Sequence, residues 1–130
     1  MILLIGAVLG FISVAFGAYS EHALRENVSA EEFRFLMTAI RYNQVNAVII
    51  CSIGMALFGQ NRISSISQFR WTGILFILGT ILFSFSIYLS VSFNMPSLVY
   101  VTPFGGIIMM ISWLLLAVSA LKFLKNQKSD

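Results

Sequence analysis

Four long apolar stretches constrain this chain more than any other feature of its sequence. An α-helix needs about 20 residues to cross a hydrocarbon layer about 30 Å thick, and each stretch comes close to that length. The connections are short, so neighbouring helices should run antiparallel. We therefore predict an all-α fold, a single integral membrane domain over residues 1–130. It should be a four-helix bundle with spans at about 2–20, 39–59, 71–93 and 103–123.

The composition supports the membrane class. Of the 130 residues, 58% are hydrophobic and 10% are charged, whereas soluble domains carry about 25% charged residues. The formal net charge of +3 is too small to suggest a nucleic-acid partner. The single cysteine, Cys51, cannot form an internal disulfide. No basic segment precedes the first apolar stretch, so we expect no cleavable signal peptide.

Capping and turn residues predict where helices begin and end. Ser29 and Glu32 have the spacing of a capping box, in which each side chain bonds the other residue's backbone N–H. The second helix should therefore begin well before it enters the membrane. Thr102 ahead of Pro103 predicts a capping hydroxyl followed by a proline at the first helical position. The segment 94–96 should break the chain between the third and fourth spans.

Lysine and arginine counts predict the orientation, because cytoplasmic loops carry an excess of these residues. The side with both termini has five: Arg62, Arg70, Lys122, Lys125 and Lys128. The opposite side, with the outer loop 21–38, has three: Arg25, Arg34 and Arg41. We therefore expect a multi-pass protein of the bacterial inner (cytoplasmic) membrane, with its N- and C-termini in the cytoplasm.

Small residues recur along one face of three spans. Lipid gives helices no hydrophobic drive to associate, so close contact between small residues holds such bundles together. We predict that these faces pack within the chain; the alternative is a dimer interface. The faces carry Gly6, Gly10, Ser13 and Gly17 in the first span, Asn43, Ala47, Cys51 and Gly54 in the second, and Gly105, Ser112 and Ser119 in the fourth.

Polar residues are concentrated in the outer half of the spans. The second span begins with RYNQVN (41–46), and the apolar run after it is too short to cross alone. These polar residues must therefore lie within the outer leaflet, at a depth similar to polar groups of the other spans. We predict an outward-opening polar pocket that binds a ligand through His22, Arg41, Tyr42, Asn46, Ser84, Tyr88 and Thr102. The alternative is a structural clasp, in which these groups only bond one another.

Patterns typical of catalysis and metal binding are weak in this chain. No serine lies in a GxSxG turn, and the lone histidine has no second base to activate a nucleophile. One histidine without a cluster of cysteines or carboxylates gives a metal ion too few ligands. Coupled transport usually needs a carboxylate inside the bundle, and none falls in the predicted spans. We expect no enzymatic activity, no cofactor and no metal site.

Four blocks of the sequence are AFGAYSEHAL (15–24), TAIRYNQVNAV (38–48), LFSFSIYL (82–89) and VTPFGGIIMMISWLLL (101–116). Together they resemble the four-span membrane proteins catalogued as domain of unknown function 423, a family that includes relatives of mitochondrial transmembrane protein 256. The resemblance covers nearly the whole chain and implies no assigned activity. His22 falls on the family's histidine. Arg41 and Asn46 stand where relatives commonly show an acidic residue and a histidine, which argues against proton handling or metal binding.

These observations favour a small binding or accessory protein. Arg41 would pair with an anionic group, while Tyr42 and Asn46 orient it. His22 would close the rim of the pocket. The expected occupant is a lipid headgroup, a small amphiphile or a partner helix. The expected partners are therefore membrane lipid and a homo-oligomer or larger membrane complex, without nucleic acid. The alternative is a small-solute transporter or channel subunit that uses the same pocket.

Overall fold

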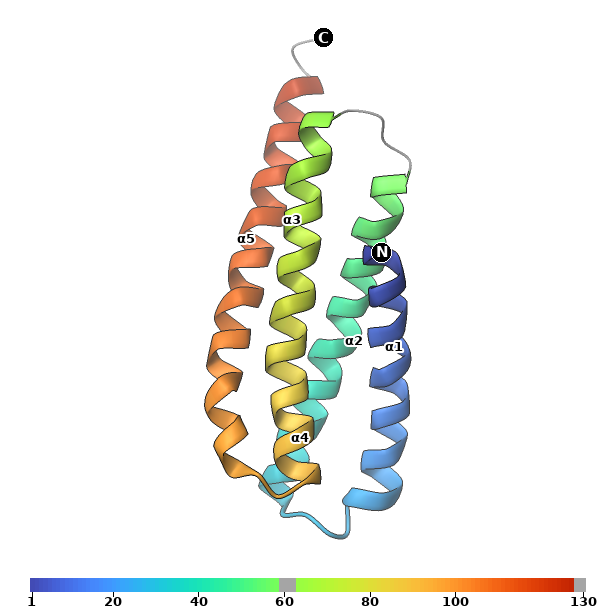
Figure 1. The fold of residues 1–130 in the computed structure, drawn as a ribbon, viewed down its shortest axis with the longest axis vertical. Helices are drawn as coiled ribbons and strands as arrows, with labels where there is room; N and C mark the ends of the chain where they lie inside the picture. The colour runs from blue at the N-terminus through green and yellow to red at the C-terminus, as the bar shows by residue number, and fades with distance from the viewer. Residues whose placement is uncertain (59–62, 128–130) are drawn as a thin grey trace.

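The chain folds into four long helical rods (Figure 1). The computed structural model describes residues 1–58 and 63–127, with side chains described at 1–58 and 67–125. The first two rods are α1 (Ile2–Tyr19), which continues into the π-helical η1 (Ser20–Leu24), and α2 (Ala30–Phe58). The third rod joins α3 (Ile63–Thr80), the π-helical η2 (Ile81–Phe85) and α4 (Ser86–Ser92). The fourth joins the 3-10 helix η3 (Pro96–Val101) to α5 (Thr102–Gln127).

The rods lie side by side, and the chain changes direction at each end of the bundle. The start of α1, the end of α2, the start of α3 and the end of α5 lie at one end, the upper one in Figure 1. We call this the termini end. The η1 segment, the start of α2, the end of α4 and η3 lie at the opposite end, which we call the far end. The halves of the bundle next to these ends are the termini half and the far half.

Three of the rods are long and apolar enough to cross a membrane. They contain the segments Ile2–Leu24, Ser67–Ser92 and Pro96–Lys125. The second rod, α2, does not meet this criterion over its described residues, because the polar run 41–46 interrupts its apolar face. With 29 residues it would still be about 43 Å long at 1.5 Å per residue. The four-span count therefore stays a prediction.

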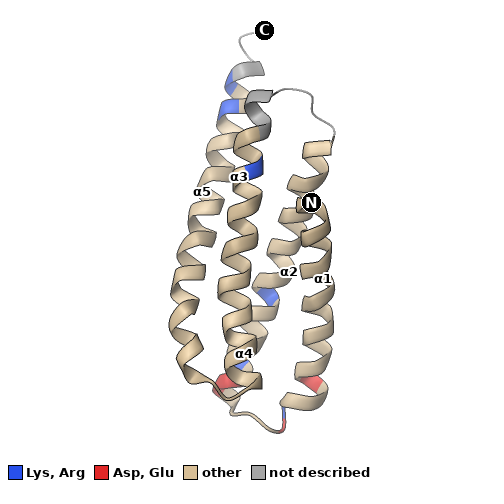
Figure 2. Cartoon of the chain, viewed as in Figure 1, with Lys and Arg blue, Asp and Glu red and all other residues tan. Residues whose placement is uncertain are grey.

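Most of the described charged residues lie toward the two ends of the rods, and one basic residue lies well inside α2 (Figure 2). No charged residue occurs between Arg70 and Lys122, so this stretch of the third and fourth rods is free of charge. Lys122 Nζ donates a hydrogen bond to Gln68 Oε1 at 3.2 Å, which aligns the two rods at the termini end. The predicted orientation rests partly on Arg62 and Lys128, whose side chains lie outside the described residues.

The small-residue faces pack within the chain, as predicted. A Cβ atom placed on Gly54 would lie 2.7 Å from Leu3 Cα, and one on Gly6 would lie 2.8 Å from Cys51 Sγ, so the two glycines let α1 and α2 touch. A Cβ on Gly105 would lie 2.8 Å from Phe83 Cα, which brings α5 against the η2 backbone. Close backbone approach is the contact that stabilises helix pairs in lipid.

The local capping prediction is confirmed at one helix start and wrong at another. Ser29 Oγ accepts the Glu32 backbone N–H at 3.2 Å, and the Glu32 carboxylate accepts the Ser29 backbone N–H at 2.8 Å, which is the predicted capping box. At the fourth rod η3 runs directly into α5, so Thr102 is not a cap. The preceding 3-10 turns continue the helical backbone there. Asn94, at the predicted break, has φ 53°, a conformation that asparagine adopts more readily than most residues.

Two apolar clusters fill the interior. The far half contains Leu24, Leu36, Ala39, Ile40, Ile87 and Tyr88. The termini half contains Leu9, Ala47, Ile50, Ile53 and Phe76. Many large apolar side chains outside these clusters are exposed, especially on α1 and α5, as expected for helices whose outer faces meet lipid.

Candidate functional site

Buried and partly buried polar side chains gather where α2 passes the third and fourth rods. We call them the polar cluster, and its members are Asn43, Asn46, Ser84, Ser86, Tyr88 and Thr102. Contacts between α1 and α2 show how far along the bundle this cluster lies. A Cβ on Gly17 would lie 3.7 Å from Ile40, and one on Gly10 would lie 3.6 Å from Ala47 Cβ. The segment 40–47 of α2 therefore lies beside residues 10–17 of α1, within a rod that is long and apolar enough to cross a membrane.

Asn43 and Tyr88 form the most deeply buried pair. The amide of Asn43, 0% exposed, donates to Tyr88 Oη at 3.3 Å, and Tyr88 is 3% exposed. The phenol ring stacks on Phe16 of α1, with ring centroids 4.0 Å apart and an interplanar angle of 19°. Asn43 Oδ1 is buried and has no hydrogen-bond partner among the described residues. The pair ties three rods together but leaves one acceptor unsatisfied.

Asn46 and Ser84 join α2 to the rods on its other side. Asn46 is 1% exposed, and its Nδ2 donates to the thioether of Met109 in α5 at 2.8 Å. A thioether sulfur is a weak acceptor, so this contact satisfies the amide only in part. Ser84 Oγ, fully buried, donates to the Ala39 carbonyl at 3.0 Å. Both bonds therefore cross between helices within the bundle.

Ser86 and Thr102 join the third rod to the fourth. Their hydroxyl oxygens are 2.8 Å apart, and Ser86 Oγ is also 2.9 Å from the Phe83 carbonyl. Because Ser86 has one proton and donates it to that carbonyl, Thr102 must donate to Ser86. Sequence analysis expects the Thr102 hydroxyl to cap a helix, but the structure uses it as a cross-helix donor.

The spacing in the LFSFSIYL block follows from this arrangement. Ser84 and Tyr88 are four residues apart, so they lie on one face of the rod and both bond α2. Ser86 lies on a different face and bonds Thr102 of α5. The π-helical η2 falls at the start of this block, and such segments often occur at functional positions.

Three of the predicted site residues lie on the exterior. Arg41 is exposed and forms no ion pair or hydrogen bond with the described residues. Tyr42 is 47% exposed, with its ring edge-on to Phe83 at 5.1 Å between centroids. His22 is exposed in η1. The carboxylate of its neighbour Glu21 bonds Arg25 at 2.8 Å.

The structure brings the seven predicted residues into one half of the bundle without joining them to each other. Three of them are buried and Thr102 is partly buried, and each of these four bonds a residue outside the predicted set: Asn46 bonds Met109, Ser84 bonds Ala39, Tyr88 bonds Asn43 and Thr102 bonds Ser86. None of the seven lines the hollow at the termini end or the hollow between α1 and α2. The predicted pocket stays a prediction.

Sequence reasoning places Asn43 on a packing face but does not include it in the site. A further pattern identifies it. Leu36, Asn43 and Ile50 recur every seven residues and are all fully buried, so Asn43 occupies the buried seam of α2. A polar residue at a seam position fixes the pairing of helices, as in coiled coils. Phe16, Ser86 and Met109 have no comparable pattern, because their roles depend on residues distant in sequence.

The described side chains fit hydrogen bonding better than acid–base or metal chemistry. Every buried polar residue that the structure describes is a serine, a threonine or an asparagine, apart from Tyr88. No group of three histidine, cysteine or carboxylate residues within the described part of the chain could hold a metal ion. The lone Cys51 is a partly buried free thiol packed against Gly6.

Comparisons with known proteins agree with this membrane architecture. Residues 16–106 match the family model described as "Protein of unknown function (DUF423)", a range that contains the whole polar cluster. The chain is 34% identical to the "UPF0382 inner membrane protein YgdD" of Escherichia coli K12 over 92% of its own length and 88% of that relative. It is 27% identical to the "UPF0382 membrane protein YwdK" of Bacillus subtilis, over 94% and 97% of the two chains.

No solved structure matches the chain. The likeness to relatives of mitochondrial transmembrane protein 256 stays a prediction. The names of the relatives describe membrane proteins, one of them of the inner membrane, and state no enzymatic activity. On the strength of the family match and of the Escherichia coli relative, this chain belongs to the DUF423 family of membrane proteins, whose function is unknown.

Proposed function

We propose that this protein is a non-catalytic lipid-binding protein of the bacterial cytoplasmic membrane. All four rods would cross, consecutive helices would run antiparallel, and both termini would lie in the cytoplasm. The site would be the outer surface of α2 around Arg41 and Tyr42, and its ligand an anionic phospholipid headgroup. The names of the inner-membrane relatives support the location. The charge-free stretch between Arg70 and Lys122 supports the crossing of the third and fourth rods.

The observation that carries this proposal is the position of Arg41. Its neighbour Ile40 packs at the level of Gly17 in α1, and Gly17 lies seven residues before the end of η1 at Leu24. That is about 10 Å inside the far end of the rod at 1.5 Å per residue. An arginine at such a depth is costly unless it reaches the headgroups or pairs with an anion. Arg41 is exposed and unpaired within the described residues, so a lipid phosphate is its natural partner.

Each predicted residue then has a role in this proposal. The guanidinium of Arg41 would bind the phosphate through two parallel hydrogen bonds, and the Tyr42 phenol beside it would orient the headgroup. His22, exposed in η1, would border the site toward the far end. Asn46, Ser84 and Tyr88 would act by holding α2 against the other rods, and Thr102 by holding the fourth rod against the third.

Transport of a small solute has less support. A coupled transporter needs an ionisable group that is reached from both sides of the membrane. Among the described residues no carboxylate, lysine, arginine or histidine is buried. The buried amides and hydroxyls instead form bonds across helices, as expected for a fixed bundle.

The test is retention of lipid by Arg41→Ala. The protein would be extracted from its membrane into polymer nanodiscs without detergent, and the anionic phospholipid held per chain would be measured by mass spectrometry. Because charged hydrogen bonds contribute about 1.5–3 kcal/mol, we expect wild type to enrich anionic lipid about tenfold over Arg41→Ala. Arg34→Ala is the matched control, since Arg34 lies seven residues earlier on α2 and is also exposed. Equal enrichment in Arg41→Ala and wild type would overturn the proposal.

A further inference from the structure

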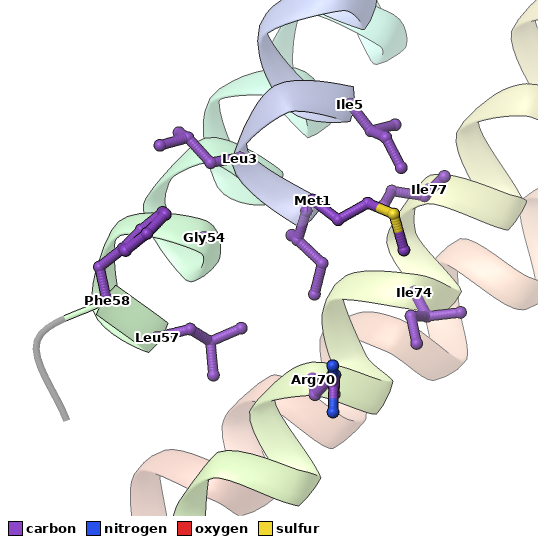
Figure 3. Close-up of a pocket in the computed structure, with 10 residues that line it drawn as sticks. Met1, Leu3, Ile5, Gly54, Leu57, Phe58, Arg70, Ile74 and Ile77 are labelled. Atoms are coloured by element: carbon purple, nitrogen blue, oxygen red, sulfur yellow. The ribbon is translucent and has the colours of Figure 1, made fainter. Parts of the chain in front are cut away.

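A hollow lies at the termini end, in the opposite half of the bundle from Arg41. The hollow has a volume of about 360 Å³ and is bounded by α1, α2 and α3 (Figure 3). Figure 3 shows the labelled side chains of Met1 and Ile5 at the start of the first rod, of Leu57 on α2 and of Ile74 on α3. The volume falls in the range of about 300–1,000 Å³ that is typical of small-molecule sites.

The lining side chains are apolar except for one. Arg70 of α3 has the charged side chain among the ten residues that line the hollow, and Met1 adds the amino group of its backbone. Arg70 is exposed and forms no ion pair or hydrogen bond with the described residues. The other lining residues are Met1, Ile2, Leu3, Ile5, Gly54, Leu57, Phe58, Ile74 and Ile77. A cation at the edge of an apolar hollow matches a ligand with an anionic head and a hydrocarbon tail.

The position of the hollow points to the membrane as the source of that ligand. Arg70 is the last charged residue before the charge-free stretch of the third rod, which places it at the headgroup boundary. Trp71, directly after it, is 62% exposed, and tryptophan is enriched at that boundary. Nearby Lys122 is held by Gln68, whereas the Arg70 side chain borders this hollow and forms no ion pair or hydrogen bond with the described residues.

The packing explains why the hollow is open. Gly73 of α3 lies against Ile2 and Ile53, since a Cβ there would be 3.2 Å from a methyl group of each. From Gly73 toward the termini end, α3 is less closely tied to α1 and α2. No side-chain hydrogen bond among the described residues joins α1 or α2 to α3 there. Because the other lining side chains are apolar, a hydrocarbon chain fits the hollow better than water does.

We propose that this hollow binds one acyl chain of an anionic phospholipid in the leaflet at the termini end, with the lipid phosphate on Arg70. The site is separate from the one proposed around Arg41, because the two arginines lie in opposite halves of the bundle. The proposed site does not depend on whether the termini end faces the cytoplasmic or the outer leaflet. The specificity has two parts: the apolar lining selects a chain, and Arg70 selects the anionic headgroup.

A single-chain probe tests this site alone. The Arg41→Ala variant, which lacks the outer arginine, would be placed in phosphatidylcholine nanodiscs and titrated with lyso-phosphatidylglycerol or lyso-phosphatidylcholine. Native mass spectrometry would count the lysolipids retained by each chain. We expect one retained lyso-phosphatidylglycerol, bound about tenfold more tightly than the neutral probe.

Two variants test the headgroup contact and the acyl-chain hollow separately. The thermal midpoint of each variant shows whether it still folds. Arg70→Ala should abolish the preference for the anionic probe. Ile74→Trp should fill the hollow and prevent retention of either probe. Leu78→Trp is the matched control, because Leu78 lies one turn further along α3, is 48% exposed and does not line the hollow; it should bind as its parent does. Retention unchanged in both Arg70→Ala and Ile74→Trp, equal affinity for the two probes, or a protein dimer without lipid would overturn the proposal.

Discussion

In the far half of the bundle, side-chain hydrogen bonds join α2 to the third rod and the third rod to α5. In the termini half, fewer side-chain hydrogen bonds join helices among the described residues. Lys122 bonds Gln68, and Cys51 Sγ lies 3.9 Å from the Leu3 carbonyl. The far half has its polar groups packed against one another, and the termini half has a hollow lined by apolar residues. One chain thus uses two ways of holding helices together.

The difference shows what each kind of contact can fix. Apolar side chains gain little by leaving lipid for one another, so the spacing of helices depends on packing and on polar bonds. Where Asn43 and Ser84 bond across helices, the separation of the rods is set by hydrogen-bond length. Where only apolar side chains face each other, as around Leu57 and Ile74, the rods can stand apart and a lipid chain can take the space.

The largest effect is expected from Gly105→Ala in the far half. The added methyl group would lie 2.8 Å from Phe83 Cα and Leu82 C, and these backbone atoms belong to a rod fixed by the polar cluster. Overpacking typically costs about 1–3 kcal/mol, and we expect the upper end or a failure to fold. Gly106→Ala is the control, since its methyl group would meet Phe83 Cδ2 at an ordinary 3.8 Å. Thermal midpoints in detergent measure both, and equal midpoints would contradict the prediction.

A similar clash in the termini half should be less harmful. In Gly54→Ala the methyl group would lie 2.7 Å from Leu3 Cα. Leu3 is near the start of α1 and borders the hollow, so the helix end has room to shift. We expect a loss of about 1 kcal/mol, at the low end for overpacking. Filling the hollow with Ile74→Trp should make Gly54→Ala more costly, and strictly additive losses would show that the hollow does not absorb the clash.

Tyr88→Phe tests the hydrogen bonds of the far half. Removing the phenol oxygen deprives the Asn43 amide of its acceptor and leaves a second polar atom unsatisfied beside Oδ1. Hydrogen bonds between membrane helices contribute about 0.6–2 kcal/mol, and we expect a loss of about 1 kcal/mol. Replacing both partners by apolar groups can be nearly neutral. The double variant Asn43→Leu with Tyr88→Phe should therefore recover most of the loss; a further loss would show that the pair is held by packing alone.

Features that depend on local spacing could be predicted from the sequence. The glycine face of α1 repeats at steps of three and four residues, and it packs on α2 as expected. The Ser29–Glu32 capping box also needs only four consecutive residues. Both depend on the geometry of one helix turn, which is the same in any context.

Features that depend on partners distant in the chain could not be predicted. The Asn43–Tyr88 bond joins residues 45 positions apart, and nothing local to either residue indicates the other. The Thr102 hydroxyl looks like a helix cap from its neighbours, yet its bond goes to Ser86. The hollow around Arg70 is harder still, because it results from the angle at which three rods meet rather than from any motif.

The smallest effect concerns the far end, where the Ser29–Glu32 capping box begins α2. Hydrogen bonds from the Ser29 backbone and hydroxyl lower the pKa of Glu32 below its ordinary value of 4.5. The carboxylate therefore stabilises the helix start above that ordinary pKa, and the contribution is lost as the pH falls through the lowered value. We expect faster amide exchange at residues 30–34 in acid than at neutral pH, after correction for the intrinsic rate. Glu32→Gln should remove this pH dependence, since glutamine can cap without titrating. If wild type and Glu32→Gln show the same pH dependence, a group other than Glu32 controls amide exchange at this helix start.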